Sequence, residues 1–300
     1  MSLVEKALRK LQNGTPPRAP ARPESPSKAG DTGAKDADTR HAAPAAQVVR
    51  PERVVTINAT ALRGAGLMPP ADKERQLAQQ YRQIKRPLIG SAIGRGAPRL
   101  PSGHIIMVAS AVPGEGKTFT AINLALSMSI EKDIRVLLVD ADVAKRHISR
   151  LLAIGDVPGL MDVLRDPKMD VESVILPTDV PNLTILAAGT ASDQATELLS
   201  SARMEETVRA IGEHDHHRVV LFDSPPLLHT TESHALMQVA GQVVVVVRAG
   251  TTSQQVLLDA LSYLGEHPAV SLILNQSTQS SPDAYYRYGY GEGWPEQSHK

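Results

Sequence analysis

One segment of the chain, Ile105 to Met128, reads IIMVASAVPGEGKTFTAINLALSM. It opens with four apolar residues in an unbroken run, and from Ala121 onward apolar residues recur at the spacing of a helix. Between the two lies a turn that ends in Gly-Lys-Thr. A strand, a glycine loop and a helix in this order are typical of a phosphate-binding loop, in which backbone N–H groups and the positive end of the helix surround phosphate oxygens.

This geometry predicts which loop residues contact a nucleotide. The Lys117 ammonium is expected to reach the β- and γ-phosphates, and the Thr118 hydroxyl is expected to bind Mg²⁺. The usual pattern is G-x-x-x-x-G-K-[ST], and Ala111 stands at its first position. The residues expected at the nucleotide are Pro113, Gly114, Glu115, Gly116, Lys117, Thr118 and Phe119.

Two further apolar runs end in carboxylates. Val136–Val139 is followed by Asp140 and Asp142, and the run at 219–222 is followed by Asp223. A single Asp after a strand is often only a helix cap or a turn residue. Ligands bind at the carboxyl edge of an open parallel sheet, so three strand ends converging there favour a nucleotide site. We expect Lys117, Asp140, Asp142 and Asp223 to be catalytic, and Thr118, Asp142 and Asp223 to hold Mg²⁺.

The chain alternates between strand and helix patterns from His104 onward. Strands are expected at 104–110, 135–140, 183–188, 218–223, 242–248 and 270–275. Helices are expected at 116–131, 158–165, 194–213, 232–239 and 252–265. Strands separated by helices of this length specify a parallel sheet, so the predicted fold is a doubly wound, mostly parallel α/β sheet.

Composition divides the chain into five segments. Residues 1–12 (MSLVEKALRKLQ) place apolar side chains on one helical face, as in an amphipathic helix. Residues 13–50 are rich in Pro and Ala and are predicted to be a disordered linker. Residues 51–90 are expected to dock on the domain or to mediate oligomerisation, with a helix at 72–86 that Pro87 ends. The predicted α/β domain with the glycine loop covers 91–278, and 279–300 form a tail.

Composition also limits the partners. The net charge is zero and no basic stripe occurs, so nucleic acid is not indicated. The absence of cysteine excludes disulfides and thiolate metal sites. The longest apolar run, Val243 to Val247, is too short to cross a bilayer. We therefore expect a cytoplasmic protein whose membrane attachment, if any, comes from a partner. The loop His214–His217 is interpreted as an ordinary surface loop rather than a metal site.

The tail concentrates the aromatic side chains. Its tyrosines are Tyr285, Tyr286, Tyr288 and Tyr290, interspersed with glycine. One alternative is an extra strand that buries them. A tail that offers phenols to an active site explains both the clustering and the glycines.

These motifs together resemble the bacterial tyrosine kinases of exopolysaccharide and capsule export, close to the exosortase (XrtA)-associated autokinase branch. The family loop S-x-x-P-G-E-G-K-[ST] is similar to Ser110–Thr118, and its second motif is similar to Val139–Asp142, continuing to Lys145 and Arg146. Its third motif is similar to 222–226. MSLVEKALRKLQ and QYRQIKRPLIG are also similar to segments of that branch. A family motif for ring assembly, E-x-x-R-x-x-R, aligns with Gln79, Arg82 and Lys85, which lack the acid.

The resemblance implies a P-loop NTPase architecture with a deviant Walker loop of the MinD type. It implies ATP and Mg²⁺ as cofactors, a tyrosine-kinase activity, and autophosphorylation of the four tail tyrosines across subunits. It further implies a homo-oligomeric ring assembled through the segment around Arg82 and the tail. A membrane polysaccharide co-polymerase, acting as a chain-length adaptor, would hold the chain at the inner face of the cell membrane.

Two alternatives remain open at this point. A positioning ATPase of the ParA or MinD type shares the fold and the carboxylates, although those proteins resemble K-G-G-x-G-K-[ST], with lysine where this chain has Val112. The other alternative is a non-catalytic, nucleotide-dependent scaffold of a polysaccharide exporter.

Overall fold

The computed structural model describes residues 53–267 and 269–277. These residues all belong to one compact unit. The expected amphipathic helix at 1–12, the linker at 13–50 and the tyrosine tail lie outside the described residues.

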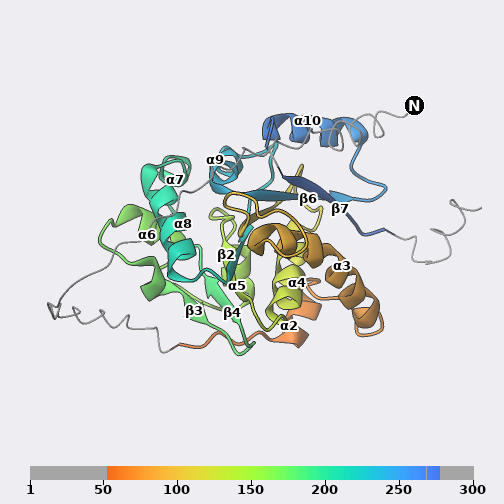
Figure 1. Cartoon of the computed structure of the whole chain (residues 1–300), viewed down its shortest axis with the longest axis horizontal. Helices are drawn as coiled ribbons and strands as arrows, with labels where there is room; N and C mark the ends of the chain where they lie inside the picture. Colours follow the sequence, from red (N-terminus) through yellow and green to blue (C-terminus); the bar gives the residue numbers. More distant parts are fainter. Residues whose placement is uncertain (1–52, 268, 278–300) are drawn as a thin grey trace, which may run out of the picture. The chain divides into compact units, whose positions relative to one another are not determined.

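A seven-stranded sheet organises the described residues, and its order is β3-β4-β2-β5-β1-β6-β7 (Figure 1). The strands are β1 (Ile105–Ser110), β2 (Arg135–Asp140), β3 (Leu176–Pro177), β4 (Leu183–Leu186), β5 (Arg218–Asp223), β6 (Gln242–Arg248) and β7 (Val270–Asn275). All neighbouring pairs are parallel except β3 with β4. The six predicted strands and the mostly parallel sheet are confirmed, and only the two-residue β3 was not predicted.

Helices cover both faces of this sheet. They are α2 (Ala59–Gly64), α3 (Glu74–Ile93), α4 (Lys117–Ser129), α5 (His147–Leu151), α6 (Leu160–Arg165), α7 (Ala195–Leu199), α8 (Ala202–His214), α9 (Glu232–Val239) and α10 (Gln254–Leu264), with a 3₁₀ turn η1 (Val171–Val174). Figure 1 shows α6, α7 and α8 gathered on one side and α3 and α4 on the other.

The two faces of β1 show why this arrangement is stable. Ile105 and Met107 belong to one buried cluster, which includes residues of α6 to α10, whereas Ile106 and Val108 belong to a second cluster with residues of α2 to α5. A strand that is buried on both faces needs an unbroken apolar run, because successive side chains point to opposite sides. The predicted doubly wound architecture is therefore confirmed.

The prediction that Pro87 ends the helix before the domain was wrong. Helix α3 continues through Pro87 to Ile93. A proline inside a helix removes a hydrogen bond and costs about 3 kcal/mol. Leu88, Ile89 and Ala92 are buried beyond it, and burial of such side chains returns about 1.5 to 3 kcal/mol for each large one. Packing of the last turns therefore outweighs the local preference to stop.

The predicted helix at 194–213 is two helices, because α7 and α8 are separated at Ser200 and Ser201. The Ser201 hydroxyl donates to the carbonyl of Leu198 at 2.6 Å. Serine side chains that bond to nearby backbone groups compete with the helical pattern, which explains the break.

The segment that precedes α3 packs on the domain, as expected from its apolar residues. Val55 and Leu62 are buried, and Val55 forms an isolated bridge to Thr178 beside β3. The Val55 amide donates to the carbonyl of Pro177 at 2.8 Å. Residues 53–68 therefore share the core cluster of α3 and α4.

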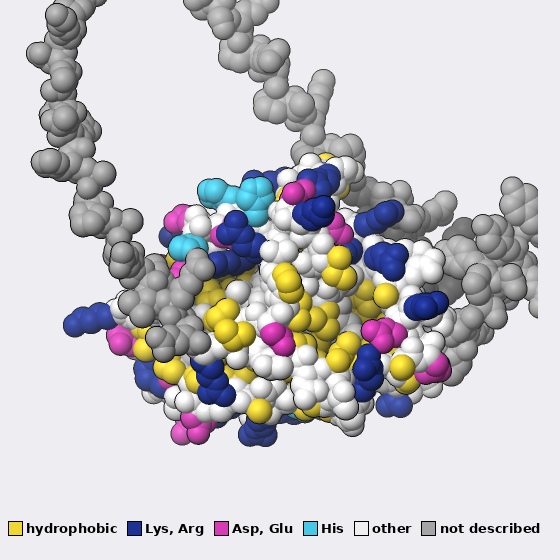
Figure 2. Space-filling view, turned by 90° about the horizontal axis from the view of Figure 1, so that it is seen from below, with side chains coloured by type: hydrophobic (Ala, Val, Ile, Leu, Met, Phe, Trp, Pro, Cys, Tyr) yellow, Lys and Arg dark blue, Asp and Glu magenta, His cyan; other side chains and the backbone are white. Residues whose placement is uncertain are grey.

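The molecular surface is mixed in charge on the face viewed from below in Figure 2. Lys and Arg side chains lie around its margin, with Asp and Glu among them and hydrophobic side chains in separate groups. Among the described residues, no helix combines the length and the apolar character needed to cross a bilayer.

Candidate functional site

The predicted site residues meet at the carboxyl edge of the sheet. The loop at 111–116 connects β1 to α4, while Asp140 ends β2 and Asp223 ends β5. These two aspartates are directly paired in the β2–β5 register. Because β5 lies between β1 and β2, the loop and both carboxylates come from adjacent strands.

Two glycines give the loop its shape. Gly114 has φ of 86° and Gly116 has φ of 97°, a left-handed conformation that side chains rarely allow. A Cβ atom on Gly116 would also collide with Nδ2 of Asn275. The loop can therefore turn its backbone toward the cavity only with glycine at these positions.

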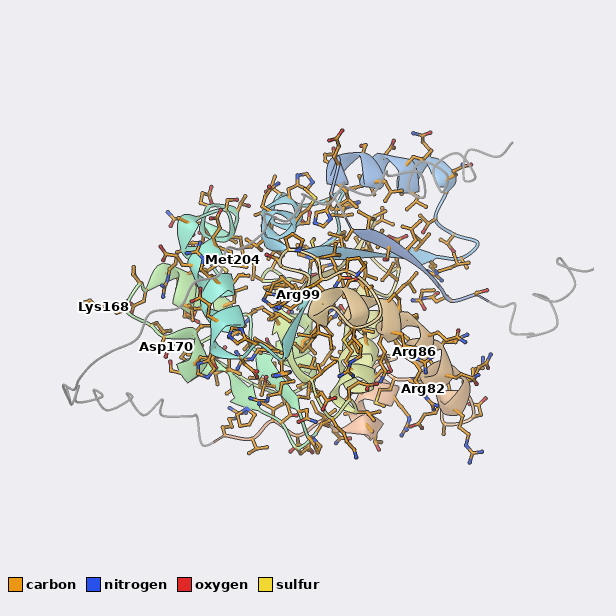
Figure 3. The ribbon with its side chains drawn as sticks, in the orientation of Figure 1. Arg82, Arg86, Arg99, Lys168, Asp170 and Met204 are labelled. Atoms are coloured by element: carbon orange, nitrogen blue, oxygen red, sulfur yellow. The ribbon has the colours of Figure 1, made fainter. Side chains whose placement is uncertain are left out.

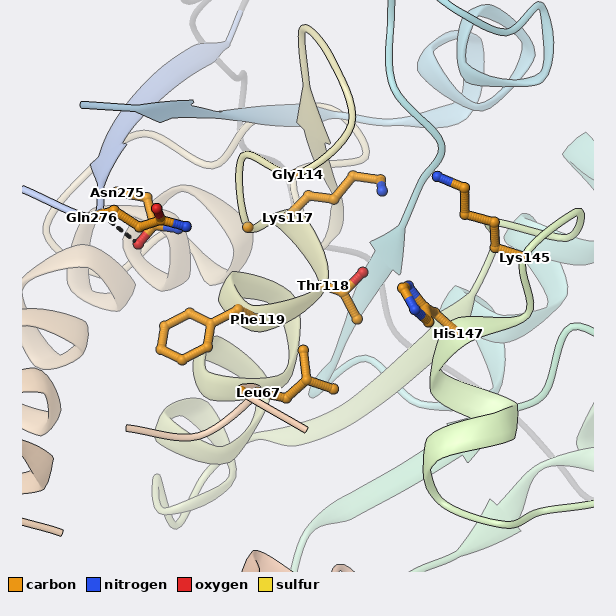
Figure 4. A pocket seen from close by; sticks show the side chains of 11 residues that line it. Leu67, Gly114, Lys117, Thr118, Phe119, Lys145, His147, Asn275 and Gln276 are labelled. Carbon is orange, nitrogen blue, oxygen red and sulfur yellow. Dashed lines mark hydrogen bonds between the residues drawn. The ribbon is translucent and has the colours of Figure 1, made fainter. Parts of the chain in front are cut away.

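The loop borders a cavity of about 320 Å³ (Figure 4). Five of the seven loop residues that were expected to contact a nucleotide line it: Gly114, Gly116, Lys117, Thr118 and Phe119. Pro113 and Glu115 are not among the lining residues. In Figure 4 the Lys117 side chain extends toward Lys145, with Thr118 facing His147 below them.

The Glu115 side chain serves the loop itself. Its Oε2 accepts a hydrogen bond from the Val112 amide at 2.8 Å, and its Oε1 accepts from the Thr252 hydroxyl. The side chain is buried and engaged by protein groups. Its carboxylate is therefore not available to contact a ligand, and only its backbone could do so.

Lys117 and Asp142 form the ion pair at the centre of the site. The Lys117 ammonium lies 3.4 Å from Asp142 Oδ2, and both side chains are less than a tenth exposed. An ion pair so buried is costly to form, because two charges must leave water. It places the only lysine of the glycine loop between the loop and the carboxylates.

Burial leaves several carboxylate oxygens without hydrogen-bond donors. Ser149 donates to Asp140 Oδ2 from its amide (2.8 Å) and from its hydroxyl (2.7 Å), but Oδ1 has no partner among the described residues. Neither oxygen of Asp223 accepts a hydrogen bond within normal geometry in the described part of the chain. Buried polar atoms left in this state are unusual in native proteins and are explained by a bound ion, an ordered water or a catalytic role.

Burial also shifts the titration of two of these groups. It raises the pKa of Asp140 to about 6, although the hydrogen bonds from Ser149 act in the opposite direction. It raises the pKa of Asp223 to about 7, against the lowering effects of the Lys117 charge and the nearby Thr118 hydroxyl. A cation that approaches Asp140 and Asp223 would therefore stabilise their ionised forms and lower their pKa values.

The donor set fits magnesium. Carboxylate and hydroxyl oxygens are the ligands that this hard cation prefers, and it usually keeps waters and binds substrate phosphates as well. Within the described ranges, no three His, Asp, Glu or Cys side chains form a complete metal site by themselves. Thr118, Asp142 and Asp223 could therefore hold Mg²⁺ together with phosphate oxygens.

Sequence reasoning missed part of the cavity wall. Gly66, Leu67, His147, Asn275 and Gln276 also line it, as does Lys145, which belongs to the second family motif but was given no role. Asn275 ends β7, so the rule that ligands bind at carboxyl ends of parallel strands could have identified it. Leu67 carries no comparable signal, because only tertiary packing brings the segment before α3 to the loop.

Comparison with known proteins identifies the domain. A family model described as an AAA domain matches residues 103–267. The tyrosine-protein kinase YwqD of Bacillus subtilis is 30% identical over 215 residues, which cover 71% of this chain and 86% of that protein. The tyrosine-protein kinase wzc of Salmonella typhimurium is 31% identical over 192 residues, which are 63% of this chain but only 26% of that protein.

Solved structures agree with the curated relatives. The VpsO kinase domain has a TM-score of 0.57 and 27% identity, and the match covers 69% of this chain and all of that domain. The BceF tyrosine kinase domain has a TM-score of 0.56 and 25% identity over 71% of this chain and 86% of that one. With the glycine loop, the paired carboxylates and these matches taken together, the chain belongs to the family of bacterial tyrosine-protein kinases.

Proposed function

We propose that this chain transfers the γ-phosphoryl group of ATP to tyrosine, and that its first acceptors are its own tail tyrosines. The observation that carries the proposal is the ion pair of Lys117, directly after a left-handed glycine loop, with Asp142, two residues beyond the paired Asp140 and Asp223 that end β2 and β5. Family membership supports the same chemistry.

The phosphates would lie in the glycine loop. Backbone amides from Gly114 to Thr118 and the Lys117 ammonium would hold them, because these groups converge on the cavity. Mg²⁺, when bound, would neutralise charge on the phosphate oxygens. Thr118, Asp142 and Asp223 would hold the ion directly or through water.

In this proposal Asp140 would receive the tyrosine proton. Its Oδ1 is buried and accepts no hydrogen bond from the described residues, whereas Ser149 donates to its Oδ2. In the transfer, the phenolic oxygen forms a bond to the γ-phosphorus while the bond from that phosphorus to the bridging oxygen breaks, and ADP leaves. A tyrosine with a pKa near 10 is only about 0.1% ionised at neutral pH. Because the transition state is loose, the proton can move late, and Asp140 serves mainly to orient the hydroxyl.

The acceptors would be Tyr285, Tyr286, Tyr288 and Tyr290 of a neighbouring copy in a homo-oligomeric ring. Arg82 and Arg86 support a contact through α3, because both are exposed on the outer side of this helix (Figure 3). Lys85 does not: its ammonium donates to the Ser127 carbonyl at 2.5 Å and lies 2.7 Å from Glu131. Only the Arg82 end of the aligned motif would then serve assembly.

Each phosphorylation would add close to two negative charges to the tail. Several such charges would repel one another and the acidic site of the neighbour, so assembly would loosen as phosphate accumulates. Through this cycle the protein would regulate the chain length and export of an exopolysaccharide. A membrane polysaccharide co-polymerase would hold it at the inner face of the membrane and activate it.

The decisive experiment separates phosphate on protein from phosphate released to water. Full-length protein is incubated with Mg²⁺ and γ-labelled ATP, with and without the cytoplasmic segment of a candidate adaptor, and phosphotyrosine is mapped. The proposal expects label on the tail. Release of phosphate without protein label would instead support a positioning ATPase of the ParA or MinD type. Nucleotide binding with neither outcome would support a scaffold.

A further inference from the structure

The nucleotide loop is tied to a part of the chain that lies far away in sequence. Glu115 is only 2% exposed, and its two carboxylate oxygens accept from three donors. One donor, the Val112 amide, belongs to the loop itself. The other two are the amide of Arg248, the last residue of β6 (3.4 Å), and the hydroxyl of Thr252, in the turn that connects β6 to α10.

This turn is well suited to hold a carboxylate. The amides of Thr251 and Thr252 both bond back to the Arg248 carbonyl, at 3.3 and 3.1 Å, so the segment is closed on itself. Ser253 then caps α10 by accepting from the Val256 amide. Because the turn is fixed at both ends, the Thr252 hydroxyl is presented to Glu115 by a rigid support.

No described cation lies within ion-pair distance of Glu115. A buried carboxylate without a cation depends on its hydrogen bonds. Loss of one donor destabilises the protein by more than the net free energy that a typical hydrogen bond contributes, because the acceptor stays buried without a partner. The carboxylate holds the loop at Val112, two residues before Gly114, the first of the two loop glycines that line the cavity. The loop conformation thus depends on donors outside the loop.

We propose that Thr252 is a positioning residue for nucleotide binding: it acts through Glu115 to hold the glycine loop in its phosphate-binding shape. Thr252 does not line the cavity, so its effect on a nucleotide must pass through the loop. The inference rests on the proposed use of this loop for ATP. It adds the β6–α10 turn to the site as its support.

The test uses full-length protein and the affinity for a fluorescent ADP analogue with Mg²⁺. Thr252→Val keeps the shape of the side chain and removes the donor, and it is expected to weaken binding about tenfold. Thr252→Ser keeps the hydroxyl and is expected to restore affinity to within about twofold of the wild type. Thr251→Val is the matched control, because its side chain is exposed and makes no hydrogen bond in the described structure.

A second readout separates positioning from general destabilisation. With ATP as substrate, Thr252→Val should raise KM about tenfold while kcat stays within about threefold, because the variant loses binding rather than a contact to reacting atoms. Thr252→Ala provides the same comparison if the valine variant does not fold. Equal affinity of Thr252→Val and Thr251→Val, or failure of the serine variant to restore binding, overturns the inference.

The same measurements test the proposed kinase activity independently of the role of Thr252. If the wild type binds the analogue but transfers no phosphate to tyrosine, the kinase proposal is wrong and the Thr252 result still decides the inference. If the wild type binds no nucleotide, both are wrong.

Discussion

The hydroxyl and the amide of Ser149 donate to the same oxygen of Asp140, at 2.7 and 2.8 Å, and leave its other oxygen without a partner among the described residues. Ser149 comes from α5 and also accepts from the Ala188 amide at 3.3 Å. The carboxylate that ends β2 is therefore oriented by groups from α5 and from the residues that follow β4.

Ser149→Ala should lower kcat about tenfold with little change in the KM for ATP, because a misoriented Asp140 affects transfer more than nucleotide binding. Steady-state kinetics of tail phosphorylation measures both. Ser149→Thr keeps the hydroxyl and should recover most of the rate. Ser129→Ala is the control, because Ser129 is also buried but its hydroxyl donates to the Leu126 carbonyl of its own helix rather than to a carboxylate. A shift in KM alone would argue against orientation of Asp140.

Lys117→Met should abolish the labelling of tail tyrosines, with a loss of about 100-fold or more, because it removes the charge that faces the phosphates. It also leaves Asp142 without its ion-pair partner. Anti-phosphotyrosine detection and mass spectrometry measure the outcome. Lys168→Met changes an exposed residue that does not line the cavity and lies far from Arg82 and Arg86 in Figure 3, so this variant should label normally. Labelling of the Lys117 variant at the wild-type rate would exclude this loop as the ATP site.

Asp223→Asn should stabilise the ligand-free protein while it abolishes transfer. Burial raises the pKa of Asp223 from 3.8 to about 7, so the folded state holds this proton more tightly than the unfolded chain does. Between about pH 4 and pH 7 the Asp223 carboxyl is ionised in the unfolded chain but still protonated in the folded protein. Rising pH therefore stabilises the unfolded chain relative to the folded protein, and the free energy of unfolding falls. At pH 8 the asparagine variant should be more stable by about 2 to 4 kcal/mol.

Urea unfolding at pH 4, 6 and 8 checks this sign. The wild type should lose stability across the series, with Asp140 contributing below about pH 6, where its raised pKa lies. The difference between Asp223→Asn and the wild type should vanish near pH 4. Asp72→Asn, at an exposed position, should follow the wild-type curve. If Asp223→Asn were less stable than the wild type at pH 8, burial of the ionised Asp223 carboxylate would not destabilise the folded protein.

Pro87→Ala should raise the melting temperature. The change restores a backbone N–H inside α3 and removes the clash of the proline ring with the preceding turn. Alanine also makes the unfolded chain more flexible, but this effect is smaller, so we expect the free energy of unfolding to rise by about 1 to 2 kcal/mol. For a domain of this size, that is about 2 to 8 °C. Pro98→Ala, in the irregular segment after α3, should instead leave stability unchanged or slightly lower. Scanning calorimetry compares the two, and a fall for Pro87→Ala would mean that the proline shapes a bend that packing needs.

Arg82 and Lys85 should behave oppositely although they belong to one aligned motif. Lys85→Met removes a buried hydrogen bond and ion pair and should lower the free energy of unfolding by about 1 to 3 kcal/mol. Arg82→Ala should leave folding unchanged and weaken self-association. Thermal unfolding and sedimentation velocity distinguish these effects. Destabilisation by Arg82→Ala with unchanged assembly would refute a subunit contact at this position.

Local sequence determined the strands, the loop and the carboxylates. Continuous apolar runs such as those at 105–108 and 219–222 can be buried on both faces only in a covered parallel sheet, and the aspartates that follow them must then lie at its carboxyl edge. The three strand ends could therefore be predicted, because an apolar run and the residues that end it can be recognised from adjacent positions in the sequence.

Only the tertiary structure decided the roles that depend on partners distant in sequence. It turned Glu115 away from the cavity toward Thr252, gave Asp140 its Ser149 donors, and carried α3 through Pro87 on the strength of its buried last turns. Each outcome is set by contacts between segments whose spacing in the chain carries no periodic signal. The sequence thus determines where the chemistry lies, and packing determines how each group is held there.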